Sequence, residues 1–280
     1  MGGTKTDMTL GTSFADMAEP VRIPTTDPET TLGEIVSFFD GAEVSAVGVA
    51  SFGPMQLDRA SSRFGTMLFT PKPGWSGVAI HERLSSGLGL PVVLDTDVNG
   101  AVVGEGEWGA ARGMDHHVYV TVGTGIGAGI VVAGRVIGGG RHPEMGHIVV
   151  SRHHDDRHEG SCPYHGECLE GMASGPALEA RFGRSETWAG NQAVVDHAAH
   201  YLAQGLVDPL QQFRAEALRQ LRPRQREQLP DALDAHLDQA RAVVLDWCYG
   251  FYNHDRRHTS AGMMSPINYE NTTAPTREAA

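Results

Sequence analysis

The stretch that decides the fold begins with His142-Pro143-Glu144-Met145-Gly146-His147 and ends with Cys162-Pro163-Tyr164-His165-Gly166-Glu167-Cys168-Leu169-Glu170. Two of the three cysteines of the chain, Cys162 and Cys168, lie here with His165 between them, and His147 precedes them. Two thiols and two imidazoles suit one tetrahedral Zn²⁺ ion. Free thiols and surface histidines in a reducing compartment are the alternative. The count of four ligands favours the metal, which would fold a loop too polar to bury itself.

Composition places the chain in a broad class. Its 280 residues are enough for two modest domains with a sizeable core. The net charge of −12 argues against nucleic acid or an anionic membrane as the main partner. Three cysteines, an odd number, argue against a disulfide framework and for a reducing compartment. The sequence shows neither an apolar run long enough to span a membrane nor a signal-peptide pattern, so we expect a cytoplasmic protein.

Glycine content divides the chain. Residues 1–205 hold 33 of the 35 glycines. Periodicity in this part predicts an α/β body, with helices over 32–39, 78–88, 101–108, 169–182 and 192–207, strands over 43–50, 91–94 and 117–122, and a hairpin over 130–137 that turns at Ala133-Gly134. Beyond it we expect a solvated, partly helical connector over 208–230 and an amphipathic helix over 231–251.

Two glycine-rich turns are candidate phosphate sites. Gly2-Gly3-Thr4-Lys5 opens the chain, and Gly123-Thr124-Gly125-Ile126-Gly127 follows the strand predicted over 117–122. The second turn matches the dinucleotide pattern Gly-x-Gly-x-x-Ala, but that fold needs a helix next, and a hairpin is predicted instead. A P-loop sequence is absent. The backbone N–H groups of two such turns could hold a triphosphate between them.

Asp97 lies at the junction between a predicted strand and a predicted helix. It could cap the helix or act as a general base at the mouth of a cleft, and its position alone leaves both interpretations open. Ser51-Phe52-Gly53-Pro54 follows another predicted strand, at the edge where α/β sheets bind ligands. Pro71-Lys72-Pro73-Gly74-Trp75 is a second rigid loop, for which a plain surface connector is an equal alternative.

Residues 2 to about 206 resemble the ROK family of sugar kinases, and most closely its bacterial fructokinases. The resemblance is carried by the two glycine turns, the two loops above, Asp95-Thr96-Asp97-Val98-Asn99 and both halves of the metal-like stretch. It implies an α/β, actin-like ATPase (ribonuclease H-like) fold with two domains, over residues 1–108 and 109–206, that close over sugar and ATP. It also implies ATP-dependent phosphorylation of D-fructose or a related hexose, and a homodimer as the common assembly.

The resemblance also assigns roles to residues. Asp97 would be the base that takes the proton from the sugar hydroxyl. Phosphoryl transfer needs mainly positioning and charge neutralisation, which suits ATP with Mg²⁺. The sugar would contact Gly53, Asp97, Glu144, His147 and Glu170, and ATP would be held by Gly2, Gly3, Thr4, Lys5, Gly123, Thr124, Gly125 and Gly127. A structural Zn²⁺ would be held by His147, Cys162, His165 and Cys168 and would orient the sugar-binding side chains.

The chain departs from the family pattern at both ends. We find no counterpart of the strand that precedes the first glycine turn in family members, nor of their later Gly-Gly-Gly turn and closing helix. The expected fold is therefore truncated at both ends, with a connector over 207–237 and a helical tail over 238–280. Residues 238 to about 270 resemble the end of insertion-sequence transposases with a DDE integrase core, without their catalytic acids. A catalytically inactive relic that still binds zinc and sugar is the alternative to an active kinase.

Overall fold

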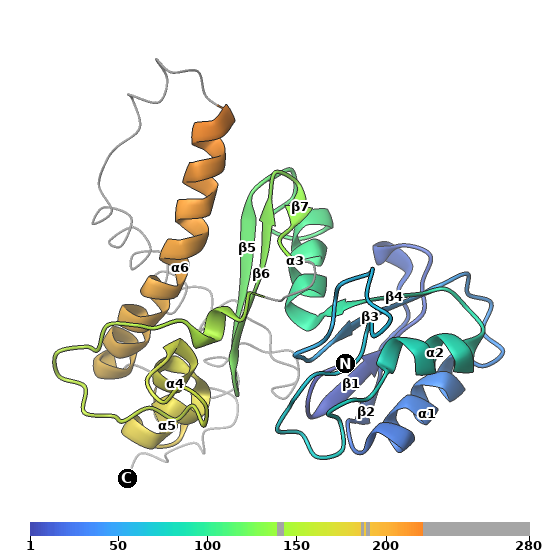
Figure 1. The fold of residues 1–280 in the computed structure, drawn as a ribbon, viewed down its shortest axis with the longest axis horizontal. Helices are drawn as coiled ribbons and strands as arrows, with labels where there is room; N and C mark the ends of the chain where they lie inside the picture. The colour runs from blue at the N-terminus through green and yellow to red at the C-terminus, as the bar shows by residue number, and fades with distance from the viewer. Residues whose placement is uncertain (139–142, 186–187, 189–190, 221–280) are drawn as a thin grey trace, which may run out of the picture. The chain divides into compact units, whose positions relative to one another are not determined.

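The computed structural model describes residues 1–138, 143–185, 188 and 191–220 (Figure 1). The chain divides into two compact units. The first consists of residues 1–120 with 128–144, and the second of residues 121–127 with the chain from 145 onward. No helix in the described part combines the length and the hydrophobicity that a bilayer crossing requires.

The first unit is a mixed α/β arrangement. In chain order its main elements are β1 (Lys5–Met8), β2 (Val21–Pro24), α1 (Pro28–Phe39), β3 (Val47–Ser51), α2 (Ile80–Leu88), β4 (Val92–Thr96) and α3 (Asp97–Glu107). β1 and β2 pair in antiparallel fashion, and β3 and β4 pair in parallel with Val49 opposite Leu94. α1 lies beside α2 (Figure 1), and both contribute to one hydrophobic core, through Ile35 and Leu84 among others.

The sequence analysis does not predict β1 and β2. Thr6 and Met8 are the buried residues of β1, and the hydroxyl of Thr6 hydrogen-bonds that of Thr25 at 2.9 Å. A strand that buries a threonine lacks the apolar alternation by which strands are identified in a sequence. The two buried hydroxyls hydrogen-bond each other, which offsets the free-energy cost of removing them from water.

The Pro71–Trp75 loop is part of the core rather than a plain surface connector. Trp75 is fully buried, and its indole N–H donates to Thr26 O at 2.8 Å. Phe52 packs edge-on against Trp75, with ring centroids 5.1 Å apart. The loop therefore supports the turn that follows β3.

A third sheet contains β5 (His117–Val122), β6 (Ile126–Val132) and β7 (Arg135–Val136), in that order. The predicted hairpin is confirmed, with Val131 opposite Val136. Its turn residues, Ala133 and Gly134, have φ values of 50° and 70°, as a two-residue turn with two left-handed residues requires. A strand rather than a helix follows the second glycine turn, which confirms that this turn is not a dinucleotide fingerprint.

The first unit extends past the boundary predicted after Trp108. Gly129 of β6 lies against α3, where an added Cβ would come within 2.2 Å of Val98 O and 2.9 Å of Val102. Only glycine permits so close an approach of strand and helix backbones. The packing therefore groups α3 and the β6–β7 hairpin in one unit.

After its glycine turn, the described part of the second unit is mostly helical. Its helical elements are the 3₁₀ turn η2 (Met145–His147), α4 (Leu169–Ala173), α5 (Gly175–Phe182) and α6 (Gln192–Gln220). The prediction of one helix over 169–182 is wrong, because the helix breaks at Ser174. Pro176 lies in the first turn of α5 and has no N–H with which to continue α4. α6 packs on α4, where Gly205 faces Leu169.

α6 is longer than predicted. It continues to Gln220, through the first part of the connector predicted over 207–237. Strong helix formers dominate residues 210–220, which explains the extension. The rest of that connector, the helix predicted over 231–251 and the transposase-like tail over 238–280 lie outside the described residues.

Candidate functional site

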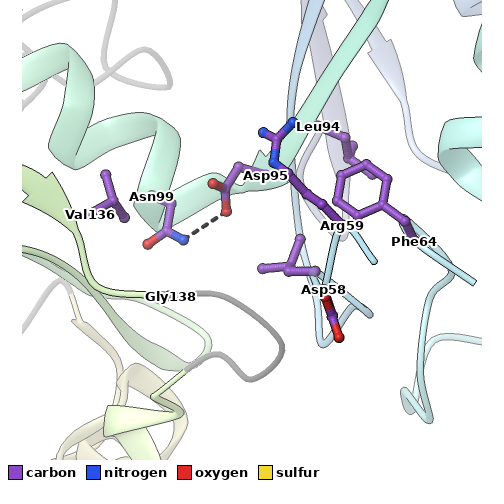
Figure 2. Close-up of a pocket in the computed structure, with 9 residues that line it drawn as sticks. Asp58, Arg59, Phe64, Leu94, Asp95, Asn99, Val136 and Gly138 are labelled. Carbon is purple, nitrogen blue, oxygen red and sulfur yellow. Dashed lines mark hydrogen bonds between the residues drawn. The ribbon is translucent and has the colours of Figure 1, made fainter. Parts of the chain in front are cut away.

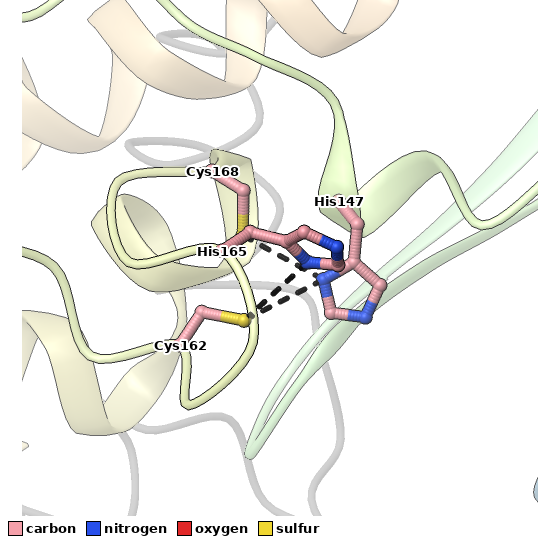
Figure 3. A group of neighbouring side chains, drawn as sticks. All are labelled: His147, Cys162, His165 and Cys168. Carbon is pink, nitrogen blue, oxygen red and sulfur yellow. Dashed lines mark hydrogen bonds between the residues drawn. The ribbon is translucent and has the colours of Figure 1, made fainter. Parts of the chain in front are cut away.

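Four side chains of the second unit converge where a zinc site is predicted (Figure 3). The donor atoms of His147, Cys162, His165 and Cys168 all lie within 4.8 Å of one another. Cys162 Sγ lies 3.7 Å from His147 Nδ1 and 3.9 Å from His165 Nδ1, and Cys168 Sγ lies 3.6 Å from His147 Nδ1. Sulfur and nitrogen ligands of one tetrahedral zinc ion lie about 3.6 Å apart. The donor set and its spacing therefore fit Zn²⁺.

Cys168 also starts helix α4. It is the N-cap residue, and its Sγ accepts a hydrogen bond from Gly171 N–H at 3.5 Å. Burial raises the pKa of the Cys168 thiol to about 11, so a cation that binds this sulfur must displace a proton. The backbone around the cluster is tightly closed, because a Cβ on Gly171 would lie 1.8 Å from Gly166 O.

Glu170 is held at the second glycine turn. Its Oε2 accepts a hydrogen bond from Ile126 N–H at 3.0 Å. A Cβ on Gly125 would lie 2.7 Å from this oxygen, so the absence of a side chain there lets the carboxylate reach the turn. Gly175 N–H donates to Gly123 O at 2.8 Å. Glu170 near the start of α4 and Gly175 at the start of α5 therefore both hydrogen-bond the second glycine turn.

A buried ionic network supports the loop between His147 and Cys162. Asp156 accepts a hydrogen bond from the Tyr201 hydroxyl at 2.7 Å and pairs with Arg181, and the two charged side chains are only 2% and 9% exposed. Burial alone would raise the pKa of Asp156, but hydrogen bonds and the Arg181 charge lower it below its ordinary value. Burial raises the pKa of Tyr201 to about 12. The network therefore consists of the ionised Asp156 carboxylate, the Arg181 cation and the neutral Tyr201 hydroxyl.

Asp97 is exposed at the first position of α3, in the first unit. The N-cap of α3 is Thr96, whose Oγ1 accepts a hydrogen bond from Asn99 N–H at 3.2 Å. Thr96, and not Asp97, is therefore the N-cap of α3. Asp97 Oδ1 accepts from Val98 N–H at 2.9 Å, which orients the carboxylate at the carboxyl end of β4. Ligands bind at this edge in α/β sheets.

The first glycine turn lies beside the end of β3. The Met1 ammonium donates to Ala50 O at 2.6 Å, and Phe52 N–H donates to Met1 O at 2.8 Å. Gly2 N–H donates to Lys5 O at 2.8 Å, which closes the turn. The predicted nucleotide turn therefore lies next to the loop that contains the predicted sugar contact Gly53.

Glu144 has an unusual backbone conformation. Its φ is 47°, and Ala133 is the other described non-glycine residue with a positive φ. For such a residue the left-handed conformation costs about 1 kcal/mol, and conformations of this kind cluster at functional sites. Glu144 belongs to the first unit, whereas His147 and Glu170 belong to the second.

A pocket of about 310 Å³ opens in the first unit (Figure 2). It is lined by Leu57, Asp58, Arg59, Phe64, Leu94, Asp95, Asn99, Val136 and Gly138, none of which the sequence analysis assigns to a site. Asn99 Nδ2 donates to Asp95 Oδ1 at 2.7 Å. Asn99 Oδ1 is buried and has no hydrogen-bond partner among the described residues. The sequence signal that could have pointed to this pocket is an asparagine just before the helix predicted over 101–108, two residues after Asp97.

Comparison with known proteins identifies the family. The ROK family profile matches residues 1–223. The chain belongs to the ROK family. A fructokinase from Zymomonas mobilis is 48% identical over 191 residues, which cover 66% of this chain and 64% of the relative. A fructokinase from Streptococcus mutans is 39% identical over 223 residues, which cover 78% of this chain and 75% of the relative.

Solved ROK structures share the fold. A ROK glucokinase from Streptomyces griseus, in complex with glucose and AMPPNP, matches with a TM-score of 0.60 at 25% identity, over 76% of this chain and 78% of that one. A ROK hexokinase from Thermus thermophilus matches with a TM-score of 0.61 at 26% identity, over 87% and 86%. The prediction of a ROK sugar kinase with the actin-like ATPase fold is therefore confirmed.

Proposed function

We propose that this chain transfers the γ-phosphoryl group of ATP to the 6-hydroxyl of D-fructose and releases fructose 6-phosphate and ADP. The fructokinases among its ROK relatives support this substrate. The structural observation that carries the proposal is the hydrogen bond from Ile126 N–H to Glu170. It joins a carboxylate proposed to bind sugar to a turn proposed to bind phosphate.

Asp97 is the proposed general base. Its carboxylate is exposed, stands at the carboxyl end of β4, and is oriented by Val98 N–H rather than used as a helix cap. It would accept the proton of the sugar hydroxyl as the hydroxyl oxygen attacks the γ-phosphorus. A positioned base of this kind contributes about 10²–10⁴-fold to the rate.

ATP is proposed to bind through the two glycine turns. A Cβ on Gly3 or on Gly123 would meet nothing within 4 Å, so a phosphate can approach the backbone N–H groups there without a side chain in the way. Lys5, which is exposed, adds a positive charge to the first turn. Mg²⁺ bound with the nucleotide would neutralise charge on the transferred phosphoryl group.

The Cys/His cluster is proposed to hold one structural Zn²⁺. Four protein ligands fill a tetrahedral shell, which is the pattern of structural rather than catalytic zinc. The ion would fix the start of α4 through Cys168, and with it Glu170 two residues later. Since Nδ1 of His147 faces the sulfurs, its Nε2 would serve the proposed sugar contact.

The test is an ADP-release assay on the folded, zinc-loaded full chain with ATP and Mg²⁺, run in parallel with fructose, mannose and glucose. The proposal expects turnover with fructose in excess of the other two hexoses. Turnover with none of them overturns the kinase. Fructose binding without ATP binding would instead identify the inactive relic that still binds zinc and sugar.

A further inference from the structure

A second group of side chains that could hold a metal ion lies outside the Cys/His cluster. His153, His154 and Asp155 are consecutive in the loop after η2, and their donor atoms lie within 4.8 Å of one another. His154 Nε2 and Asp155 Oδ2 are 2.8 Å apart. Adjacent ligands of an octahedral ion with bonds of about 2.1 Å lie about 3 Å apart. This pair therefore already has the spacing of two ligands on one cation.

Helix α6 places the ring of a further histidine, His197, against that of His153, next to the three side chains whose donor atoms lie within 4.8 Å of one another. The ring centroid of His197 lies 4.4 Å from that of His153. Nδ1 of His197 must carry a proton, because its hydrogen-bond partner at 2.8 Å is the carbonyl oxygen of Ala193. In the neutral ring, the lone pair of Nε2 then points away from the helix backbone. Metal-binding histidines are commonly oriented in this way, by donating the other ring N–H to a backbone carbonyl.

The loop that carries the group is anchored to α6 without any metal. His153 N–H donates to the Tyr201 hydroxyl at 3.1 Å. Ser151 N–H donates to Gln204 Oε1 at 2.7 Å, and the ring N–H of His200 donates to Ser151 O at 2.8 Å. The backbone of the loop is therefore positioned in advance, and only side-chain rotations remain to be fixed on binding.

The chemistry of these donors selects a class of cation. Imidazole nitrogens with a single carboxylate suit Zn²⁺, Ni²⁺, Co²⁺ and Cu²⁺. Mg²⁺ and Ca²⁺ prefer a shell made of oxygen ligands, which three histidines do not provide. The His154 and Asp155 side chains are 78% and 71% exposed, so water can complete the shell.

We propose that His153, His154, Asp155 and His197 bind a second divalent transition-metal ion. The site shares no ligand with the Cys/His cluster, and it would join the loop to α6. It is independent of the proposed kinase activity, so it can be tested without substrate.

The experiment uses the tag-free full chain, loaded with zinc and dialysed against a chelator too weak to strip the Cys/His cluster. Titration with NiCl₂ is followed by calorimetry and by metal analysis. The proposal expects one further equivalent of Ni²⁺, which an excess of MgCl₂ does not displace. Absence of a further bound equivalent overturns the site.

Variants identify the ligands. His154→Gln, Asp155→Asn and His197→Gln should each weaken Ni²⁺ binding at least tenfold while the zinc content stays at that of the parent. His116→Gln in the first unit and Asp196→Asn, beside His197 on α6, are the matched controls and should bind Ni²⁺ as the parent does. Unchanged affinity in His197→Gln would mean that the loop binds nickel as any His-His-Asp peptide would, and would overturn the four-ligand site. Thermal melting checks that every variant is folded.

Discussion

At the residue scale, the carboxylate of Asp97 carries the proposed chemistry. Asp97→Asn keeps the size of the side chain and an acceptor for Val98 N–H, but an amide cannot take the proton of the sugar hydroxyl. We expect kcat to fall about 10²–10⁴-fold, with the melting temperature and zinc content unchanged. Steady-state kinetics with fructose measures this.

The control for this variant lies on the same helix. Glu107 is exposed at the end of α3, and Glu107→Gln removes the same charge from the same unit. It should retain the parental kcat. Equal losses in the two variants would mean that net charge, rather than a base at position 97, limits the rate.

Arg181 compensates a carboxylate that has been removed from water. Arg181→Met would leave Asp156 buried without its cation, and we expect the free energy of unfolding to fall by about 3–5 kcal/mol. Denaturant titration measures the loss. Arg83→Met, which breaks the surface pair with Glu29, should cost about 0–1 kcal/mol. Similar losses in both would contradict a special role for the buried pair.

The lowered pKa of Asp156 predicts a pH dependence. A carboxyl whose folded pKa lies below its unfolded value stabilises the protein above the unfolded pKa, about 4, and this stability is lost as the pH falls through the folded pKa. The difference in unfolding free energy between the parent and Asp156→Asn should therefore be constant from pH 7 to 5 and shrink below about pH 4. Because acid would remove the proposed zinc ion from both proteins, the difference is the relevant quantity. A difference that grows on acidification would contradict the assignment.

At the element scale, the contact between Glu170 and the second glycine turn depends on the absence of a side chain at Gly125. Gly125→Ala places a methyl group 2.7 Å from Glu170 Oε2 and should displace that carboxylate from Ile126 N–H. If the displaced carboxylate loses one charged hydrogen bond to fructose, of about 1.5 kcal/mol, fructose binds roughly tenfold more weakly. Calorimetric titration with fructose in the absence of ATP measures it. Gly123→Ala meets nothing within 4 Å and should bind fructose normally.

Sequence patterns predict the helices and strands whose formation is determined by residues close together in the sequence. The β6–β7 hairpin was recognisable because Ala133-Gly134 separates two apolar runs at the spacing of a two-residue turn. α1 begins at Pro28, four residues before its predicted start, because Asp27 caps it outside the apolar repeat. β1 does not show in the sequence pattern because the hydroxyl of its buried Thr6 pairs with that of Thr25, just after β2, and no local pattern contains this contact.

At the scale of the whole molecule, the Cys/His cluster is proposed to hold the second unit together through a metal. Cys168→Ser should lower zinc affinity more than tenfold and lower the melting temperature, because both the ion and its loop closure are lost. Metal analysis and calorimetric melting measure the two effects. Cys248→Ser, which changes the third cysteine of the chain, should keep the parental zinc content. Full zinc occupancy in Cys168→Ser would contradict the assignment of this ligand.

The candidate site was predictable only in part. Three of the four cluster residues lie within seven positions, and together with His147 the count of four ligands suggested a metal. The bond from Ile126 N–H to Glu170 spans 44 positions, and only the folded chain brings the two together. The same is true of His153 and His197, and of the pocket lined by Asn99 and Asp95. Contacts between distant elements depend on packing that periodicity does not encode.

The N-cap residue of helix α4 is a cysteine, Cys168. Serine, aspartate and asparagine are preferred at helix N-caps. The residue that would stabilise the helix end best at position 168 therefore differs from the cysteine that the proposed metal centre needs. An engineering campaign that improves helix ends one position at a time would rank Cys168→Ser as beneficial. It would thereby discard a ligand of the metal centre that we propose positions Glu170, and a design protocol for this chain should exclude position 168 from such scoring.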